Sequence, residues 1–204
     1  EPADVHIISG NWFAYEQWKD HPRTLMINRA WWGDPDCVSI GWLQPDGSRK
    51  FATGDAPRPK PDLYDWKPTW PLAQLPVIRC IVLSDYQQDC REVVKQASAR
   101  FPSVQVREHP ADIGYKRAVT LKDDVQWADV VVGHSGSAIF EAIKYGTPVI
   151  CTDERNPCMP VCSRMDEELF RGDRTQWLHD MSYAQWSLSE IASGEAWQLL
   201  KEHL

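Results

Sequence analysis

A proline-rich stretch constrains this chain more than any other feature of its sequence. Residues 56–76, APRPKPDLYDWKPTWPLAQLP, contain six prolines. Because proline lacks a backbone N–H and holds φ near one value, this stretch cannot form a continuous helix or a central strand. We therefore expect a semi-extended linker here, between a smaller part at residues 1–70 and a larger part at residues 71–204.

Beyond the linker, short apolar runs alternate with longer amphipathic runs. They predict strands at residues 77–84, 104–110, 129–134 and 147–153, and helices at residues 85–101, 121–128 and 137–146. Asp85 suits the N-cap of the first helix, and Gly146 suits the C-terminal end of the last. This order predicts an α/β domain with a parallel, Rossmann-like sheet and helices on both faces.

Weaker patterns flank this region. Ahead of the linker, strand-like runs at residues 4–9, 24–29 and 37–43 predict a small α/β subdomain. After about residue 174, two helices are expected, at residues 175–182 and 189–204. Ser187 and Glu190 have the spacing of a capping box at the start of the second.

Charge and hydropathy exclude some functions. The net charge is −7, and no block of lysines and arginines is present, which argues against non-specific nucleic-acid binding but leaves a local basic groove open. No apolar run approaches the roughly 20 residues of a membrane-spanning helix, and we see no signal peptide. Eleven tryptophans are unusual; core packing is favoured over a stacking surface for sugars or bases.

The six cysteines do not indicate a disulfide framework. A chain of this size can be stabilised by its core alone, so reduced thiols and a cytoplasmic location are the favoured interpretation. Cys158 and Cys162 have a C-x3-C spacing that suits a metal, but no second Cys or His pair lies nearby. We expect no metal site and no cofactor.

The stretch GHSGSAIFEAIKYG, residues 133–146, carries the first functional signal. Small polar residues follow a predicted strand at the edge where parallel sheets bind ligands, and the helix dipole there favours an anion. Glu141, four residues after Ser137, suits the hydroxyls of a ribose. The alternative is an ordinary N-cap serine with a solvent-exposed glutamate.

A second polar loop closes the preceding predicted strand. Arg107, Glu108, His109 and Pro110 should emerge on the same edge of the sheet, where a histidine can donate to a phosphate. A His-Pro pair alone is usually a turn. Two polar loops on successive strand ends favour a binding site.

Three segments of the chain resemble the nucleotide-binding half of GT-B glycosyltransferases: HP (109–110), ADVVVGHSGSAIFEAIKYGTPVI (128–150) and DRTQWLHDMSYAQWSLSEIASGEAWQLL (173–200). They are most similar to the capsule-polysaccharide group, including Kdo- and sialyl-transferase-like enzymes, and to related small phage proteins. INRAWWGDPDCVSIGW (27–42) is also similar to an N-terminal segment of such phage proteins. The resemblance implies a Rossmann-like nucleotide-binding domain at residues 71–204 and an acceptor-side subdomain at residues 1–70.

The resemblance also implies roles for particular residues. The donor nucleotide and its phosphates would contact His109, Pro110, His134, Ser135, Gly136 and Ser137, with Glu141 on the ribose. His134 is equally well explained as a core histidine. Arg29 and Arg155 are candidate phosphate partners, with exposed, solvated charge as the alternative.

An inverting enzyme would also need a base from the N-terminal half to deprotonate the acceptor hydroxyl. Asp34 and Asp36, beside two tryptophans, are the first candidates, and Asp20 with His21 is the second. The alternative for WWGDPD is a turn initiated by Asp-Pro.

Three functional hypotheses remain open. The first is a metal-independent glycosyltransferase, cytoplasmic or in the host cytoplasm if phage-encoded, that moves a sugar from a nucleotide-sugar to a glycan or a modified DNA base. The second is a phage-type DNA base-modification transferase that uses no sugar and must flip its target base out of the duplex. The third is an inactive nucleotide-binding module, favoured by the short N-terminal half.

Overall fold

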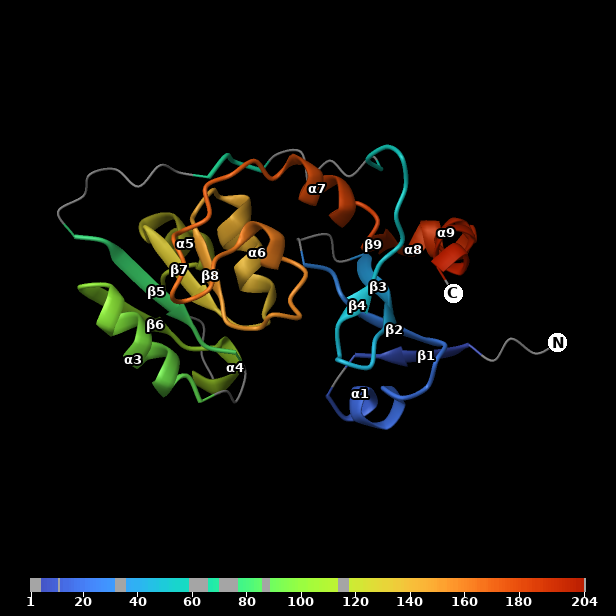
Figure 1. The fold of residues 1–204 in the computed structure, drawn as a ribbon, viewed down its shortest axis with the longest axis horizontal. Helices are drawn as coiled ribbons and strands as arrows, with labels where there is room; N and C mark the ends of the chain where they lie inside the picture. Colours follow the sequence, from blue (N-terminus) through green and yellow to red (C-terminus); the bar gives the residue numbers. More distant parts are fainter. Residues whose placement is uncertain are drawn as a thin grey trace. The chain divides into compact units, whose positions relative to one another are not determined.

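A computed structural model describes residues 5–10, 12–31, 36–58, 66–69, 77–85, 89–113 and 118–203. The chain divides into two compact units (Figure 1). Unit 1 combines Glu1–Tyr64 with Thr175–Leu204, and unit 2 is Asp65–Arg174. This division differs from the expected boundary at residue 70, because the C-terminal segment belongs with the N-terminal part of the chain.

Unit 2 contains the expected parallel sheet. Its strands are β5 (Arg79–Leu83), β6 (Ser103–Arg107), β7 (Val130–Gly133) and β8 (Val149–Cys151), in the spatial order β6-β5-β7-β8. Every pairing between them is parallel. The helices of the unit are α3 (Arg91–Arg100), α4 (Pro110–Ile113), α5 (Leu121–Trp127), α6 (Ser137–Lys144) and the 3-10 turn η1 (Met159–Val161). The prediction of alternating strands and helices around a parallel sheet is confirmed.

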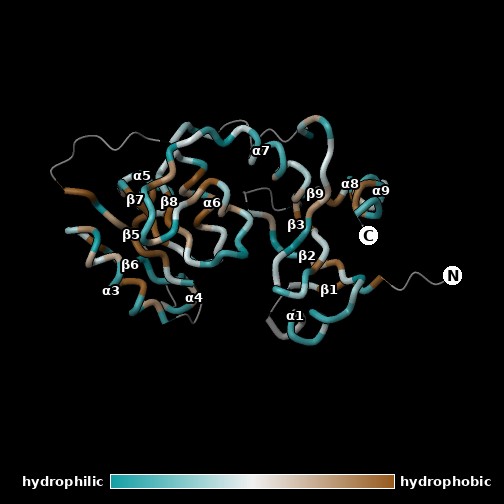
Figure 2. Tube along the Cα trace, viewed as in Figure 1, coloured by the Kyte–Doolittle hydropathy of each residue, from teal (hydrophilic) through white to brown (hydrophobic). Residues whose placement is uncertain are grey.

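Both faces of the central strands in unit 2 are buried. Cys80 and Val82 of β5 pack against Ala97 and Phe101 at one face, beside α3. Because side chains alternate along a strand, Ile81 points to the opposite face, where α5 and α6 lie (Figure 1). This two-sided burial explains why the strands are continuous apolar runs, coloured brown in Figure 2.

The ends of the helices in unit 2 follow local signals, with one exception. Gly146 follows the C-cap residue of α6, Tyr145, and adopts φ 84°, the left-handed conformation that glycine accepts most easily at a helix end. Thr120 and Asp123 form a capping box at the start of α5. Helix α3, however, begins at Arg91 with Cys90 as its N-cap, so the expected cap at Asp85 is wrong. The Asp85 carboxylate makes different contacts, described below.

Unit 1 is built on a mixed sheet. Its strands are β1 (His6–Ser9), β2 (Thr24–Arg29), β3 (Cys37–Leu43), β4 (Arg49–Lys50) and β9 (Gln185–Ser187), and α1 (Trp12–Trp18) connects β1 to β2. β1 pairs with β2 in parallel, and β3 pairs with β2, β4 and β9 in antiparallel fashion. The strands expected at residues 24–29 and 37–43 have the predicted bounds.

The C-terminal segment joins unit 1 through its own strand and helices. It contains α7 (Thr175–Met181), β9, α8 (Leu188–Ala192), α9 (Glu195–Leu200) and the 3-10 turn η2 (Lys201–His203). The predicted capping box is confirmed, because Ser187 accepts from Glu190 N while the Glu190 carboxylate accepts from Ser187 N. The single helix expected over residues 189–204 is wrong: Gly194 adopts φ 82° and separates α8 from α9.

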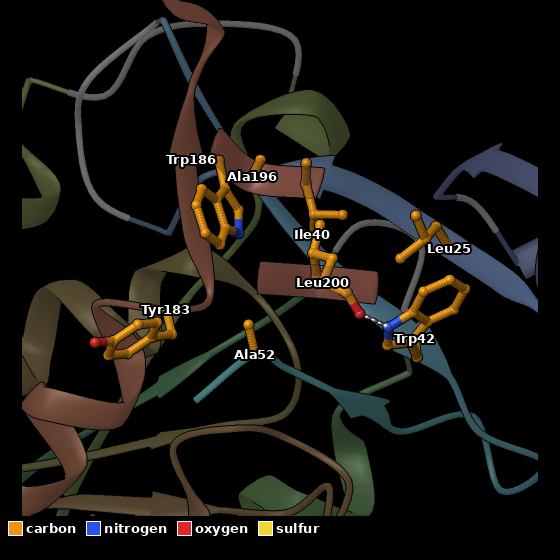
Figure 3. Close-up of a cluster of buried hydrophobic side chains, with 8 residues drawn as sticks. All are labelled: Leu25, Ile40, Trp42, Ala52, Tyr183, Trp186, Ala196 and Leu200. Atoms are coloured by element: carbon orange, nitrogen blue, oxygen red, sulfur yellow. Dashed lines mark hydrogen bonds between the residues drawn. The ribbon is translucent and has the colours of Figure 1, made fainter. Parts of the chain in front are cut away.

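The core of unit 1 lies between β3 and the C-terminal helices, and two tryptophans occupy it (Figure 3). Trp186 is fully buried, and Trp42 is 4% exposed. The indole N–H of Trp42 donates to the Leu200 carbonyl at 2.8 Å. The remaining members of this cluster are Leu25, Ile40, Ala52, Tyr183, Ala196 and Leu200. These two tryptophans support the packing interpretation of the tryptophan content.

A buried arginine connects the C-terminal segment to residues 51–58. Arg58 is 7% exposed, and its guanidinium carbon lies 3.6 Å from the ring centroid of Trp186. One terminal nitrogen donates to the carbonyls of Ser182 at 3.1 Å and Gln185 at 3.2 Å. The other contacts the Glu190 carboxylate. These contacts, together with the β3–β9 pairing, explain why residues 175–204 belong to unit 1.

Acid sensitivity is expected from an ion pair in unit 2. Asp129 is 7% exposed and accepts hydrogen bonds from Arg79 N at 2.8 Å and Arg79 Nε at 3.0 Å. The Arg79 side chain holds the pKa of Asp129 below its ordinary value, against an opposing effect of burial. A lowered folded pKa stabilises the protein above the ordinary carboxyl pKa, and the effect is lost as pH falls through the folded value.

Asp129→Asn should therefore destabilise the protein at pH 7 by about 1–2 kcal/mol, at the lower end because Arg79 is partly solvated. The difference from wild type should shrink as pH falls below about 4. Urea unfolding at pH 7, 5 and 3 measures it, with the exposed Asp166→Asn as the control. A difference that stays constant with pH would contradict the assignment.

Candidate functional site

A pocket of about 220 Å³ lies in unit 2, at the carboxyl ends of three adjacent strands. Parallel α/β sheets bind ligands at this edge, because the loops leading into the helices diverge there. The described lining residues come from the ends of β5 and β6, from α5 and from the start of α6: Leu83, Ser84, Asp85, Arg107, Glu108, His109, Pro110, Leu121, Gly136, Ser137 and Ala138. The structure therefore brings together His109, Pro110, Gly136 and Ser137, four of the seven residues expected at the nucleotide.

The loop between β7 and α6 holds a carboxylate. Ser135 donates to Asp85 Oδ2 through its backbone N at 2.9 Å and through its hydroxyl at 2.6 Å. Gly136 is the N-cap of α6 and has no side chain to cap the helix. A Cβ atom on Gly136 would lie 2.7 Å from Asp85 Oδ1, so the glycine permits this close approach. The loop thus already binds one anionic group.

His109 adopts a defined tautomer at the start of α4. Its ring Nδ1 accepts a hydrogen bond from Ala111 N at 3.2 Å, and its carbonyl accepts one from Asp112 N at 2.9 Å. Since Nδ1 is the acceptor, the proton of the neutral ring resides on Nε2. The local helix start therefore makes Nε2 the donor atom of this side chain.

Arg107 is the basic side chain in the described lining, and its charge is balanced within the unit. It is 11% exposed and forms an ion pair with Asp124. Its guanidinium also donates to the carbonyl of Val119 at 3.4 Å. Asp85 and Glu108 add two carboxylates to the same lining. The described lining is therefore not strongly positive.

The other expected nucleotide contacts lie outside the pocket lining. The ring Nδ1 of His134 lies 3.0 Å from the Thr152 hydroxyl, and its carbonyl accepts from Asn156 at 3.2 Å. Glu141 is half-buried on α6, and its carbonyl accepts from Tyr145 N at 3.1 Å. Ser135 reaches the lining only through its hydrogen bonds to Asp85.

Arg155, a candidate phosphate partner, is an exposed member of an ion pair. It donates to Asp153 Oδ1 through Nε at 2.9 Å. Burial raises the pKa of Asp153, but hydrogen bonds from Arg155 outweigh this effect and hold the pKa below its ordinary value. Any phosphate bound by Arg155 would have to compete with this carboxylate.

The candidate catalytic residues belong to unit 1. Asp20 is exposed, and the His21 ring lies 3.9 Å from the His6 ring and 5.8 Å from the Trp18 ring, between centroids. Asp36 is exposed, and its carbonyl accepts from Leu188 N at 2.9 Å.

Two predicted site residues remain, the candidate phosphate partner Arg29 and the candidate base Asp34. Arg29 is exposed at the end of β2. Asp34 lies outside the described residues.

Three buried cysteines lie at the end of β8 and on both sides of η1: Cys151, Cys158 and Cys162. Burial raises the pKa of Cys158, and a hydrogen bond with Cys158 lowers that of Cys151. Within the described ranges, no group of three or more His, Cys, Asp or Glu side chains is placed to hold a metal ion. No helix in the same ranges is both long and apolar enough to span a membrane.

Comparison with solved structures finds a likeness to KpsC, a β-Kdo 2,7-transferase from Thermosulfurimonas dismutans. The TM-score is 0.53 and the sequence identity 12%, over 97% of this chain and 85% of that chain. The two proteins share a fold. Neither a protein-family model nor a curated protein sequence matches this chain.

Sequence reasoning did not name three charged residues of the pocket as site residues: Asp85, Arg107 and Glu108. Asp85 follows β5 just as Ser135 follows β7, and Arg107 ends β6. The signal that could have found Asp85 is its position after an apolar strand, at the same edge as His109. Because aspartate is also a common N-cap residue, Asp85 was interpreted as the start of the next helix instead.

Proposed function

We propose that this protein is a glycosyltransferase that binds the nucleotide of a nucleotide-sugar donor in the pocket of unit 2. One observation carries the proposal: His109, Pro110, Gly136 and Ser137 line a single pocket at the carboxyl edge of a parallel sheet. The fold shared with a β-Kdo transferase supports sugar transfer as the chemistry.

The proposed donor contacts follow from local geometry. Nε2 of His109 donates a hydrogen bond to a phosphate oxygen, because Nδ1 is already the acceptor for Ala111 N. The N-terminus of α6 at Ser137 stabilises the negative charge that develops on the leaving nucleotide. Charge stabilisation of this kind requires no metal ion, so we propose a metal-independent reaction.

The acceptor hydroxyl requires a general base. We propose a carboxylate or histidine of unit 1 for this role, with Asp34 or Asp36 first and Asp20 with His21 second. A glycan is the proposed acceptor. Substituting each of these four residues separately and measuring kcat identifies the base.

A nucleotide panel tests the proposal most directly. We expect at least one of CMP, CDP, UDP and GDP to raise the melting temperature of the full chain. A nucleotide present at 100 times its Kd stabilises the folded state by about 2.7 kcal/mol. His109→Ala should weaken that nucleotide's binding about tenfold, the effect of one hydrogen bond to a charged group.

The matched control is His203→Ala, which removes a histidine of unit 1 outside the pocket. It should leave the Kd for the nucleotide unchanged in isothermal titration. The proposal fails if none of the four nucleotides binds either to the wild-type protein or to Asp85→Asn, which removes a carboxylate from the pocket lining. Binding without transfer or hydrolysis of any nucleotide-sugar, with acceptors supplied, would instead indicate a binding module.

A further inference from the structure

Asp85 lines the pocket and occupies two hydrogen-bond donors of the adjacent β7–α6 loop, donors that a phosphate bound at this loop would also use. Its Oδ2 accepts from both the backbone N and the hydroxyl of Ser135. We propose that Asp85 is an intramolecular competitor of the donor phosphate and restricts nucleotide binding until its carboxylate moves aside. This inference rests on the proposed function, because it assumes that a nucleotide phosphate binds at this loop.

The local structure holds the carboxylate in the pocket. Asp85 comes two residues after the end of β5, and β5 pairs with β7, which leads into the Ser135 loop. Gly136 leaves the space that the carboxylate uses, since a Cβ there would approach Asp85 Oδ1 to 2.7 Å. Asp85 is also a lining residue of the 220 Å³ pocket itself. A bound anion and the Asp85 carboxylate would therefore share one small space.

The charges of the lining strengthen the competition. Arg107 is the only arginine or lysine among the described lining residues, and it is paired with Asp124. Glu108 adds a second negative charge near Asp85. A phosphate entering this space meets like charge, which disfavours binding unless a carboxylate is displaced or neutralised. Removing the charge of Asp85 should therefore favour the nucleotide.

Asp85→Asn tests this directly, because asparagine keeps the size of the side chain and an oxygen that can accept from Ser135 N. CMP, CDP, UDP and GDP are each titrated calorimetrically into the full-length wild-type and variant proteins. We expect the variant to bind the preferred nucleotide about tenfold more tightly, as removal of an adjacent like charge implies. In the variant, the amide resonance of Ser135 should shift when that nucleotide is added.

Two controls separate the local effect from general ones. Asp89→Asn removes an exposed carboxylate four residues away, paired with Arg91 and absent from the described lining, and should leave the Kd unchanged. The melting temperature of Asp85→Asn without nucleotide shows whether the variant folds. If it does not, Asp85→Ser, which also removes the charge, is measured in its place.

The outcomes distinguish this inference from the proposed function. Tighter binding by Asp85→Asn, or binding by Asp85→Asn alone, supports competition. Equal or weaker binding by a folded variant overturns it while the proposed function stands. Absence of binding by both proteins to all four nucleotides overturns both.

Discussion

Trp186→Ala should lower the free energy of unfolding by about 3–5 kcal/mol, the usual cost of removing a buried tryptophan. The Trp186 side chain is fully buried in the unit 1 cluster, beside Ile40 and Ala196 (Figure 3). Its removal leaves a large cavity between β3 and the C-terminal helices, and it also removes the aromatic face on which Arg58 stacks. Both losses weaken the packing of the C-terminal segment against the rest of unit 1.

The matched control is Trp197→Ala, because Trp197 is 42% exposed on α9. Its substitution should cost far less. Urea unfolding of the full chain measures the total change, and hydrogen exchange at the Ile40 amide, which donates to the Ala184 carbonyl at 3.0 Å, reports on the β3–β9 layer. Equal costs for the two tryptophans would show that the buried cluster is not the main source of stability in unit 1.

Arg58→Ala should destabilise the protein by about 3–5 kcal/mol, the range for breaking a buried ion pair from one side. The substitution leaves the Glu190 carboxylate without its buried partner. It also removes the guanidinium donors from the carbonyls of Ser182 and Gln185. Arg58→Lys keeps the charge but loses the planar donors and the stacking on Trp186, so an intermediate cost is expected.

Arg164 provides a control that, like Arg58 with Glu190 and Glu195, has two ionic partners, but it is far more exposed to solvent. It pairs with Glu154 at 3.0 Å and Glu167 at 3.1 Å, and its side chain is 51% exposed. Arg164→Ala should have a much smaller effect in the same urea unfolding experiment, because exposed ion pairs are screened by water. If Arg58→Ala were no more costly than Arg164→Ala, burial would not explain how the C-terminal segment is held.

The central strands of unit 2 could be predicted because burial on both faces makes them uninterrupted apolar runs. β7 and β8 lie within the expected ranges 129–134 and 147–153. β9 could not be predicted in this way. It is three residues long, and its partner β3 lies about 150 residues earlier in the chain, so no local pattern reports the pairing. Gly194 interrupts an otherwise helical pattern because its backbone is left-handed. A glycine in the sequence permits this conformation but does not require it.

The candidate site could be predicted only as far as the sheet edge. Parallel strands bring their carboxyl ends together, so His109 and Ser137 were expected at one edge, and both line the pocket. The direction of each side chain at a strand end is not encoded by spacing. His134 turns toward Thr152, and Asp85 turns toward Ser135 instead of capping a helix. These side-chain orientations depend on contacts between loops that are far apart in the sequence.

The return of residues 175–204 to unit 1 has a consequence for biosynthesis. Unit 2 is one continuous segment, so all of its strands are available once Arg174 has been translated. The mixed sheet, by contrast, lacks β9 until Ser187 has been translated, after the whole of unit 2. We therefore expect the parallel sheet of unit 2 to fold first during translation. The mixed sheet of unit 1 becomes complete later, when β9 pairs with β3.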